Sequence, residues 1–138
     1  MKTWGYELLM PGRPSGAEQR RALQALGVDT GARGTRWTDK LERAKRHPTA
    51  GRTQLVARND LIAAVRPGDT VVVADPLCLG TGPKDAAWFL GELSSRGAAV
   101  TINGDLIRLE PGGDAEPAVA EFARRLSAYH ARKSRGRS

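Results

Sequence analysis

Two aspartates are the residues whose positions best suit chemistry. Asp39 ends a short predicted strand over residues 35–39, and Asp75 directly follows a nearly all-apolar strand over residues 70–74. Because sites collect at the carboxyl ends of parallel strands, the two carboxylates could bind a metal as a pair. Local hydrogen bonds, or pairing with Arg52, are the alternatives that we favour. We therefore predict no metal site and no cofactor.

Other reactive side chains are predicted to have structural roles. Cys78 is the only cysteine and has no histidine near it in sequence, which favours an inert thiol. His47 and His130 show no metal-ligand spacing. The glycines of residues 79–85, LGTGPKD, do not form a GxxxxGK[ST] phosphate loop, so we interpret them as turn glycines.

Two basic segments are the strongest functional signal. The formal net charge is +7 and the pI is about 10.3, which favours an anionic partner, nucleic acid first. The first segment spans residues 33–58, and the second is the C-terminus, which has no acid after Glu121. The predicted nucleic-acid contacts are Arg43, Lys45, Arg46, Arg52, Arg124, Arg125, Arg132, Lys133, Arg135 and Arg137. The competing interpretation of the C-terminus is a solvated, solubilising tail.

The elements that must position these residues alternate between strands and helices. Hydrophobic patterning predicts strands over residues 1–9, 35–39, 70–74 and 98–102, with a short edge strand over 107–109. Helices are predicted from Gly16 (capped by Ser15), over 53–65, over 84–96 and from 116 to about 133, with a mobile loop over 41–51. This order predicts a three-layer α/β fold with a mostly parallel sheet and flanking helices.

The chain length and composition set the broad class. A chain of 138 residues suits one domain, which we divide into an α/β body over 1–110, a C-terminal helix over 111–131 and a disordered basic tail over 132–138. A single cysteine excludes an internal disulfide, and no apolar stretch approaches 18 residues. We expect a cytoplasmic protein with no membrane partner.

One long segment resembles a known family. Residues 68–102 read GDTVVVADPLCLGTGPKDAAWFLGELSSRGAAVTI, which is similar to the core of the resolvase/invertase-type serine recombinase catalytic domain. The resemblance covers roughly residues 3–107. It includes Gly5-Tyr6, Gln19, Leu23 with Gly27-Val28, Thr38-Asp39-Lys40, Arg52 before Leu55, Asp75, and Gly97 to Val100.

The chain departs from the family where the chemistry lies. Met10 stands at the nucleophilic serine position, and Leu8, Pro76 and Leu79 stand at arginine positions. A thioether cannot attack phosphorus, and these side chains cannot bind a phosphate. The resemblance thus implies a vestigial site of Tyr6, Met10, Asp39, Arg52 and Asp75, with no catalytic residues and no strand cleavage.

Two side questions follow from this resemblance. A displaced serine, Ser15 with Arg13, could replace the nucleophile, but a helix cap at Ser15 is the interpretation that we favour. Tyr6 is predicted to be a packed aromatic residue with a hydrated hydroxyl.

Two functions remain open. The first is a catalytically inactive recombinase-like domain that binds nucleic acid, DNA more than RNA, with low sequence specificity, as an accessory or regulatory factor. The second is a scaffold for protein interaction or self-assembly. A homodimer could form through the apolar residues of the last helix, Val119, Phe122, Leu126 and Tyr129, which equally suit packing on the domain's own core.

Overall fold

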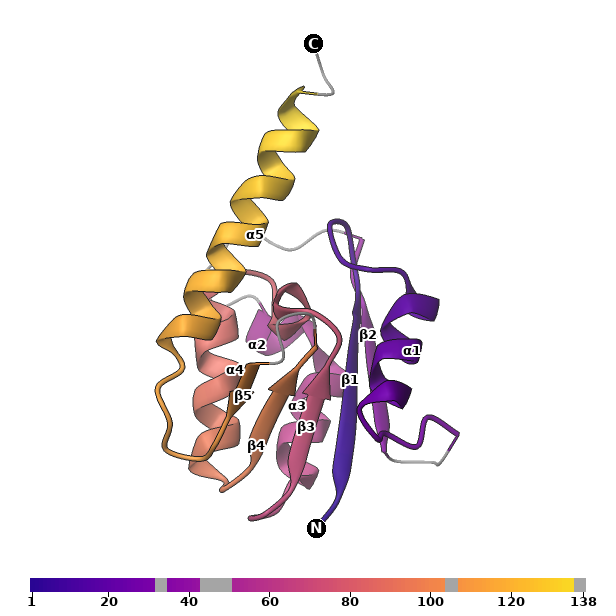
Figure 1. Ribbon diagram of the computed structural model, residues 1–138, viewed down its shortest axis with the longest axis vertical. Helices are drawn as coiled ribbons and strands as arrows, with labels where there is room; N and C mark the ends of the chain where they lie inside the picture. The colour runs from indigo at the N-terminus through magenta and orange to yellow at the C-terminus, as the bar shows by residue number, and fades with distance from the viewer. Residues whose placement is uncertain (32–34, 43–50, 104–106, 136–138) are drawn as a thin grey trace.

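A five-stranded, mostly parallel sheet forms the centre of the protein. The computed structural model describes residues 1–31, 35–42, 51–103 and 107–135 (Figure 1). The strand order is β2 (Arg36–Lys40), β1 (Thr3–Leu9), β3 (Thr70–Val73), β4 (Ala99–Ile102) and β5 (Ile107–Leu109). The first four are parallel, and β5 runs antiparallel to β4. The predicted α/β class is confirmed.

Helices cover both faces of the sheet. One face carries α1 (Gly16–Ala25), and the other is covered by α3 (Val56–Ala64), α4 (Pro83–Ser95) and the first half of α5 (Glu116–Arg135) (Figure 1). A short helix, α2 (Gly51–Gln54), precedes α3, and a 3-10 helix, η1 (Pro76–Leu79), follows β3. Within the described residues, no helix combines the length and apolarity needed to cross a membrane.

Alternation along β1 divides the core between the two faces. Trp4, Tyr6 and Leu8 point into the larger core, shared with α3, α4 and α5. Gly5 lies on the opposite face under Leu23 of α1. A Cβ at Gly5 would lie 2.8 Å from Leu23 Cδ1, so glycine lets α1 approach the sheet closely.

A buried glutamine replaces a missing strand at the end of β1. Strand β3 pairs with β1 only as far as Tyr6 opposite Val73. Beyond that point, Gln19 accepts a hydrogen bond from Leu8 N at 2.9 Å and donates one to Leu8 O at 2.8 Å. Because buried backbone groups are costly to leave unpaired, this fully buried side chain keeps β1 extended to the sheet edge.

The helix predicted over residues 53–65 is interrupted at Leu55. Leu55 has non-helical angles (φ −94°, ψ 75°) and offers no side-chain cap for α3. Asp39 of β2 supplies the cap instead, accepting from Ala57 N at 3.0 Å and from Arg58 N at 2.9 Å. A carboxylate at a helix N-terminus also meets the positive end of the helix dipole. This long-range contact has no local sequence signal.

Two other boundaries differ from prediction. The 3-10 helix η1 was not predicted, and Asp75 caps it by accepting from Leu77 N at 2.9 Å. The last helix continues to Arg135, so residues 132–135, predicted as the start of the tail, are helical. The predicted mobile loop lies largely outside the described residues.

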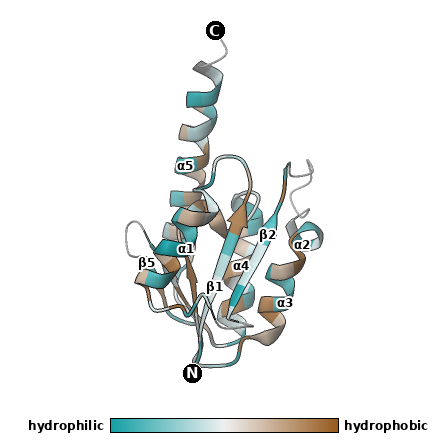
Figure 2. Ribbon diagram, turned by 90° about the vertical axis from the view of Figure 1, so that its right-hand side faces the viewer, coloured by the Kyte–Doolittle hydropathy of each residue, from teal (hydrophilic) through white to brown (hydrophobic). Residues whose placement is uncertain are grey.

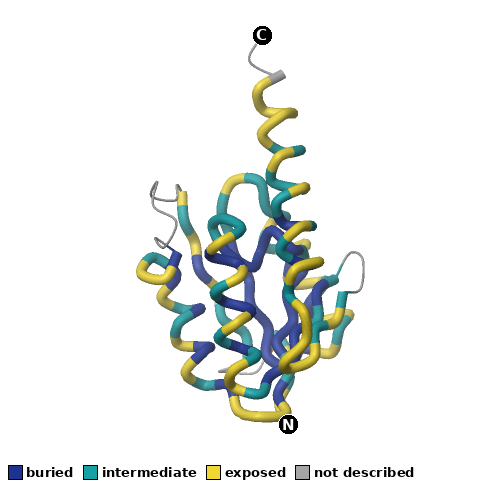
Figure 3. Tube along the Cα trace, turned by 90° about the vertical axis from the view of Figure 1, so that its left-hand side faces the viewer, coloured by how far each residue is buried: buried dark blue, intermediate teal, exposed yellow. Residues whose placement is uncertain are grey.

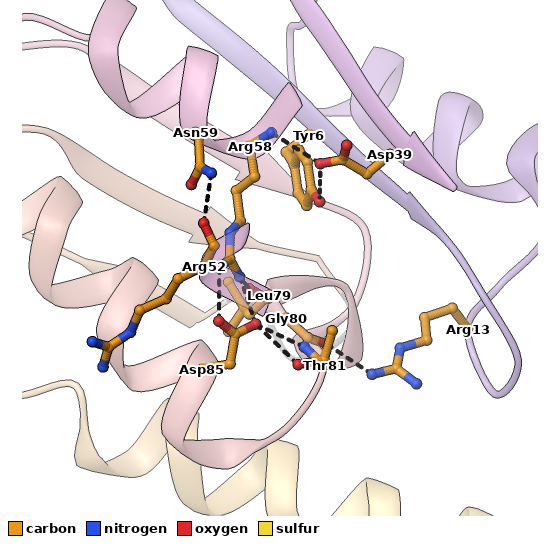
Figure 4. Close-up of polar contacts among 10 residues, drawn as sticks. All are labelled: Tyr6, Arg13, Asp39, Arg52, Arg58, Asn59, Leu79, Gly80, Thr81 and Asp85. Atoms are coloured by element: carbon orange, nitrogen blue, oxygen red, sulfur yellow. Dashed lines mark hydrogen bonds and ion pairs between the residues drawn. The ribbon is translucent and has the colours of Figure 1, made fainter. Parts of the chain in front are cut away.

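A fully buried ion pair joins α3 to the start of α4 (Figure 4). The Arg58 guanidinium donates to both carboxylate oxygens of Asp85, at 2.8 and 2.7 Å, and to Leu79 O at 3.0 Å. Asp85 also accepts from Thr81 N at 2.9 Å. Both side chains are 0 % exposed, and a Cβ on Gly80 would overlap the Asp85 carboxylate. The pair therefore fixes the turn between η1 and α4.

We predict that Asp85→Ala lowers the free energy of unfolding by about 3–5 kcal/mol, because it leaves the Arg58 cation buried without its counter-ion. Urea denaturation measures this change. The double variant Arg58→Met/Asp85→Ala should recover part of the loss. Equal or greater destabilisation of the double variant would contradict the proposed source of the cost.

Candidate nucleic-acid interface

The C-terminal half of α5 projects beyond the carboxyl edge of the sheet (Figure 1). Its outer turns are largely exposed (Figure 3) and predominantly hydrophilic (Figure 2). From Phe122 to its end, α5 carries no acidic residue. Its basic residues there are Arg124, Arg125, Arg132, Lys133 and Arg135. The helix thus places positive charge beside the loops where parallel-sheet proteins gather their sites.

One side of α5 faces a cleft that we call the arginine cleft. Its volume is about 480 Å³, and it lies between α5, the loop after β1 and the start of η1. Its lining residues are Gly12, Arg13, Pro14, Asp75, Leu77, Arg124, Arg125, Ala128 and Arg132. Four of these are arginines and one is acidic, so the cleft suits an anion.

The acids near this cleft are held by neighbouring arginines. Asp75 Oδ2 accepts from Arg125 Nη1 at 2.9 Å, and this ion pair fastens α5 to η1. Hydrogen bonds from Arg124 and Arg125 lower the pKa of Glu121 to about 2. Both carboxylates therefore hold arginines in place, and Arg132 lies about two turns beyond Arg125 along the helix.

Arg13 fastens the loop after β1 to the same region. Its guanidinium donates to Leu77 O at 2.9 Å. It also donates to Gly80 O at 2.7 Å (Figure 4). Its Cζ also lies 5.9 Å from the centre of the Phe122 ring. Burial lowers the pKa of this guanidinium, with neighbouring groups opposing the shift. Arg13 is thus first a structural residue, and it lines the cleft as well.

A second cleft, which we call the Tyr129 cleft, lies on the neighbouring side of α5. Its volume is about 420 Å³. It is lined by Met10, Pro11, Arg13, Glu42, Thr81, Leu126, Tyr129, His130 and Lys133. Arg13 lines both clefts, so they adjoin each other at the loop after β1.

The predicted contact residues divide into separate groups. Arg124, Arg125 and Arg132 line the arginine cleft, and Lys133 lines the Tyr129 cleft. Arg52 lines neither, because its Cζ lies 5.2 Å from the centre of the Trp88 ring of α4. Arg135 is the last residue of α5. The predicted contacts Arg43, Lys45, Arg46 and Arg137 lie outside the described residues.

The predicted vestigial site is not one cluster in the structure. Tyr6 is 0 % exposed, and its hydroxyl donates to Asp39 Oδ2 at 2.8 Å, so the hydrated hydroxyl was wrong (Figure 4). Met10 lies in the Tyr129 cleft and Asp75 lines the arginine cleft. Asp75 makes the expected local hydrogen bond, from Leu77 N, and also binds Arg125. Asp39 instead caps α3 through long-range contacts, so the expected local role is wrong for it. Among the described residues, no group of three or more His, Cys, Asp and Glu side chains could hold a metal ion.

The remaining sequence candidates have structural roles. Ser15 caps α1 by accepting from Glu18 N at 3.2 Å, as predicted. Cys78 is fully buried, and burial raises its pKa to about 12, as an inert thiol requires.

The sequence points to Arg13 only as a partner of Ser15 and to Tyr129 only as an interface or core residue, and it does not place either residue in a cleft. The available signal for Arg13 was an arginine set between Pro11 and Pro14 directly after the first strand. An arginine in a loop at the carboxyl end of a strand is a candidate binding residue, even where the neighbouring serine only caps a helix.

Comparison with protein-family models and with curated proteins found no match. The resemblance to serine recombinases thus rests on the residues described above.

We predict that Tyr6→Phe lowers stability near neutral pH by about 2 kcal/mol, because the phenol donates to a carboxylate. Burial first, and then the Asp39 charge, raise the Tyr6 pKa well above 10.0 in the folded state. The folded state therefore keeps this proton while the unfolded chain loses it near pH 10.0. The stabilisation that the Tyr6 hydroxyl gives the folded state is complete below that pH and declines as the pH rises above it.

Urea unfolding at neutral pH and above pH 10.0 measures both effects. The Phe variant should lose stability less steeply at high pH than the unmodified protein. Tyr129→Phe is the matched control, since it removes the other tyrosine hydroxyl. Identical high-pH slopes for Tyr6→Phe and the unmodified protein would contradict the role assigned to the phenol.

Proposed function

We propose that this protein is a catalytically inactive serine-recombinase-like domain that binds nucleic acid, DNA foremost, through phosphate contacts at the arginine cleft and the projecting half of α5. The observation that carries the proposal is the gathering of cations at the carboxyl edge of the sheet. Four arginines line one cleft there, on and beside a helix segment that has no acid. Phosphate neutralisation by such groups supplies most non-specific affinity.

The absence of catalysis is supported by the positions that the resemblance assigns to chemistry. Met10 has no nucleophilic oxygen. Leu8, Pro76 and Leu79, at the arginine positions, are all buried in the core. Arg125 and Arg132 line the cleft at this edge from α5 instead, Arg125 paired with Asp75 and Glu121. Binding without cleavage fits an accessory or regulatory factor.

The alternative of self-assembly through α5 receives less support. Ala118 and Phe122 are 0 % exposed within the protein's own core, and Val119 and Leu126 pack partly against it. Most of the apolar residues of α5 therefore already have partners in the same chain. The projecting turns present charge, which favours an anionic partner over an apolar one.

We predict that Arg132→Gln/Lys133→Gln weakens binding to a DNA duplex and flattens its salt dependence. If both residues contact phosphates, the slope of log affinity against log salt falls in magnitude by about 1.8. Fluorescence anisotropy of a labelled duplex across a salt series gives the slope. Removing the residues after Ala131 should act in the same direction.

The matched control is Arg66→Gln/Arg96→Gln, which removes the same charge from exposed residues in the turns after α3 and α4. This variant should keep the slope of the unmodified protein. If the slope of log affinity against log salt falls equally in both double variants, net charge alone would explain binding and the assigned surface is wrong. Absence of binding to both a duplex and a single strand of DNA by the unmodified protein at low salt would overturn the proposed function.

A further inference from the structure

The Tyr129 cleft combines features that the phosphate contacts do not use. Its walls include the apolar side chains of Met10 and Leu126 and the aromatic ring of Tyr129. Its volume of about 420 Å³ falls in the range of small-ligand sites. A purely electrostatic surface for a duplex backbone has no need of such a recess.

The Tyr129 ring is held in place by the loop after β1. A Cβ built on Gly12 would lie 3.0 Å from Tyr129 Cδ1 and Cε1, and Gly12 has a φ of +84°. Both the close approach and the positive φ require glycine there. The His130 ring lies 5.5 Å from the Tyr129 ring, centre to centre, at a 50° tilt. The aromatic wall is therefore ordered before any ligand binds.

The charges around this recess favour a ligand that carries phosphate. Arg13 and Lys133 line it, and Glu42 is the acidic residue among its lining. Arg13 also lines the adjoining arginine cleft. A nucleotide unit joins a flat base to a phosphate through one sugar, so it could place its base in one cleft and its phosphate in the other.

We propose that the Tyr129 cleft binds an unpaired base of single-stranded DNA, stacked on Tyr129, while the adjoining phosphate lies in the arginine cleft. This inference rests on the proposed function and deepens it: the preferred ligand is a single strand. A base in a duplex would have to unpair and unstack before it entered the recess, which costs free energy. Stacking of this kind tolerates any base, since each has a π-face. Low sequence selectivity follows.

The decisive experiment compares two labelled probes on the unmodified protein. One is a thymidine homopolymer, and the other is an abasic strand of the same length with the same phosphates. We expect the thymidine strand to bind roughly fivefold or more tightly at matched salt, as loss of one stacked base implies. Equal affinities would overturn the stacking site.

Variants then assign the effect to Tyr129. Tyr129→Leu should remove the preference for the thymidine strand, while Tyr129→Phe, which keeps the ring, should retain it. Duplex affinity should change little in either variant, and thermal unfolding checks that the loop contact at Gly12 survives. Retained preference in a folded Tyr129→Leu variant would overturn the assignment.

The two proposals fail in different ways. Binding to the duplex, together with equal affinities for the thymidine strand and the abasic strand, would overturn only the stacking site. Absence of binding to the duplex, the thymidine strand and the abasic strand at low salt would sink the proposed function together with it.

Discussion

The turn from Pro76 to Gly80 is held by two arginines, and the carboxyl edge of the molecule depends on it. A 3-10 helix leaves carbonyl oxygens without helical partners, and these must be satisfied where they are buried. Arg58 satisfies Leu79 O from within the core, and Arg13 satisfies Leu77 O and Gly80 O from the loop after β1. The same turn receives α5 through the ion pair between Asp75 and Arg125. Three separate segments are thereby positioned around one short element.

The electrostatic balance at this edge follows from where the acids are used. Asp39 caps α3, Asp85 forms the buried ion pair with Arg58, and Asp75 forms the ion pair that holds α5. Each of these three carboxylates therefore stabilises the fold. Beyond them α5 presents cations, and Glu42 is the acidic residue that lines the Tyr129 cleft. Basic residues can in this way gather on one surface, although acidic and basic residues are interspersed in the sequence.

The resemblance to a recombinase and the departures from it have one physical interpretation. Positions where phosphate-binding arginines are expected carry Leu8, Pro76 and Leu79, which pack in the core. A side chain committed to the core cannot also reach a phosphate. The cations that line the edge belong instead to α5 and to Arg13, so the proposed binding surface does not use the positions that the resemblance assigns to arginines.

The sequence by itself determined the α/β class, the mostly parallel sheet, the Ser15 cap and the structural role of Cys78. These features depend on local periodicity, turn chemistry and composition, which act over a few residues. Tertiary structure alone decided the rest: the break at Leu55, the capping of α3 by Asp39, the Arg58–Asp85 pair and the meeting of Gly12 with Tyr129. Each joins residues far apart in the chain, and no short-range pattern encodes such a contact. For the same reason, the basic residues could be listed from sequence, but which of them share a cleft was decided by the path of α5 over the sheet edge.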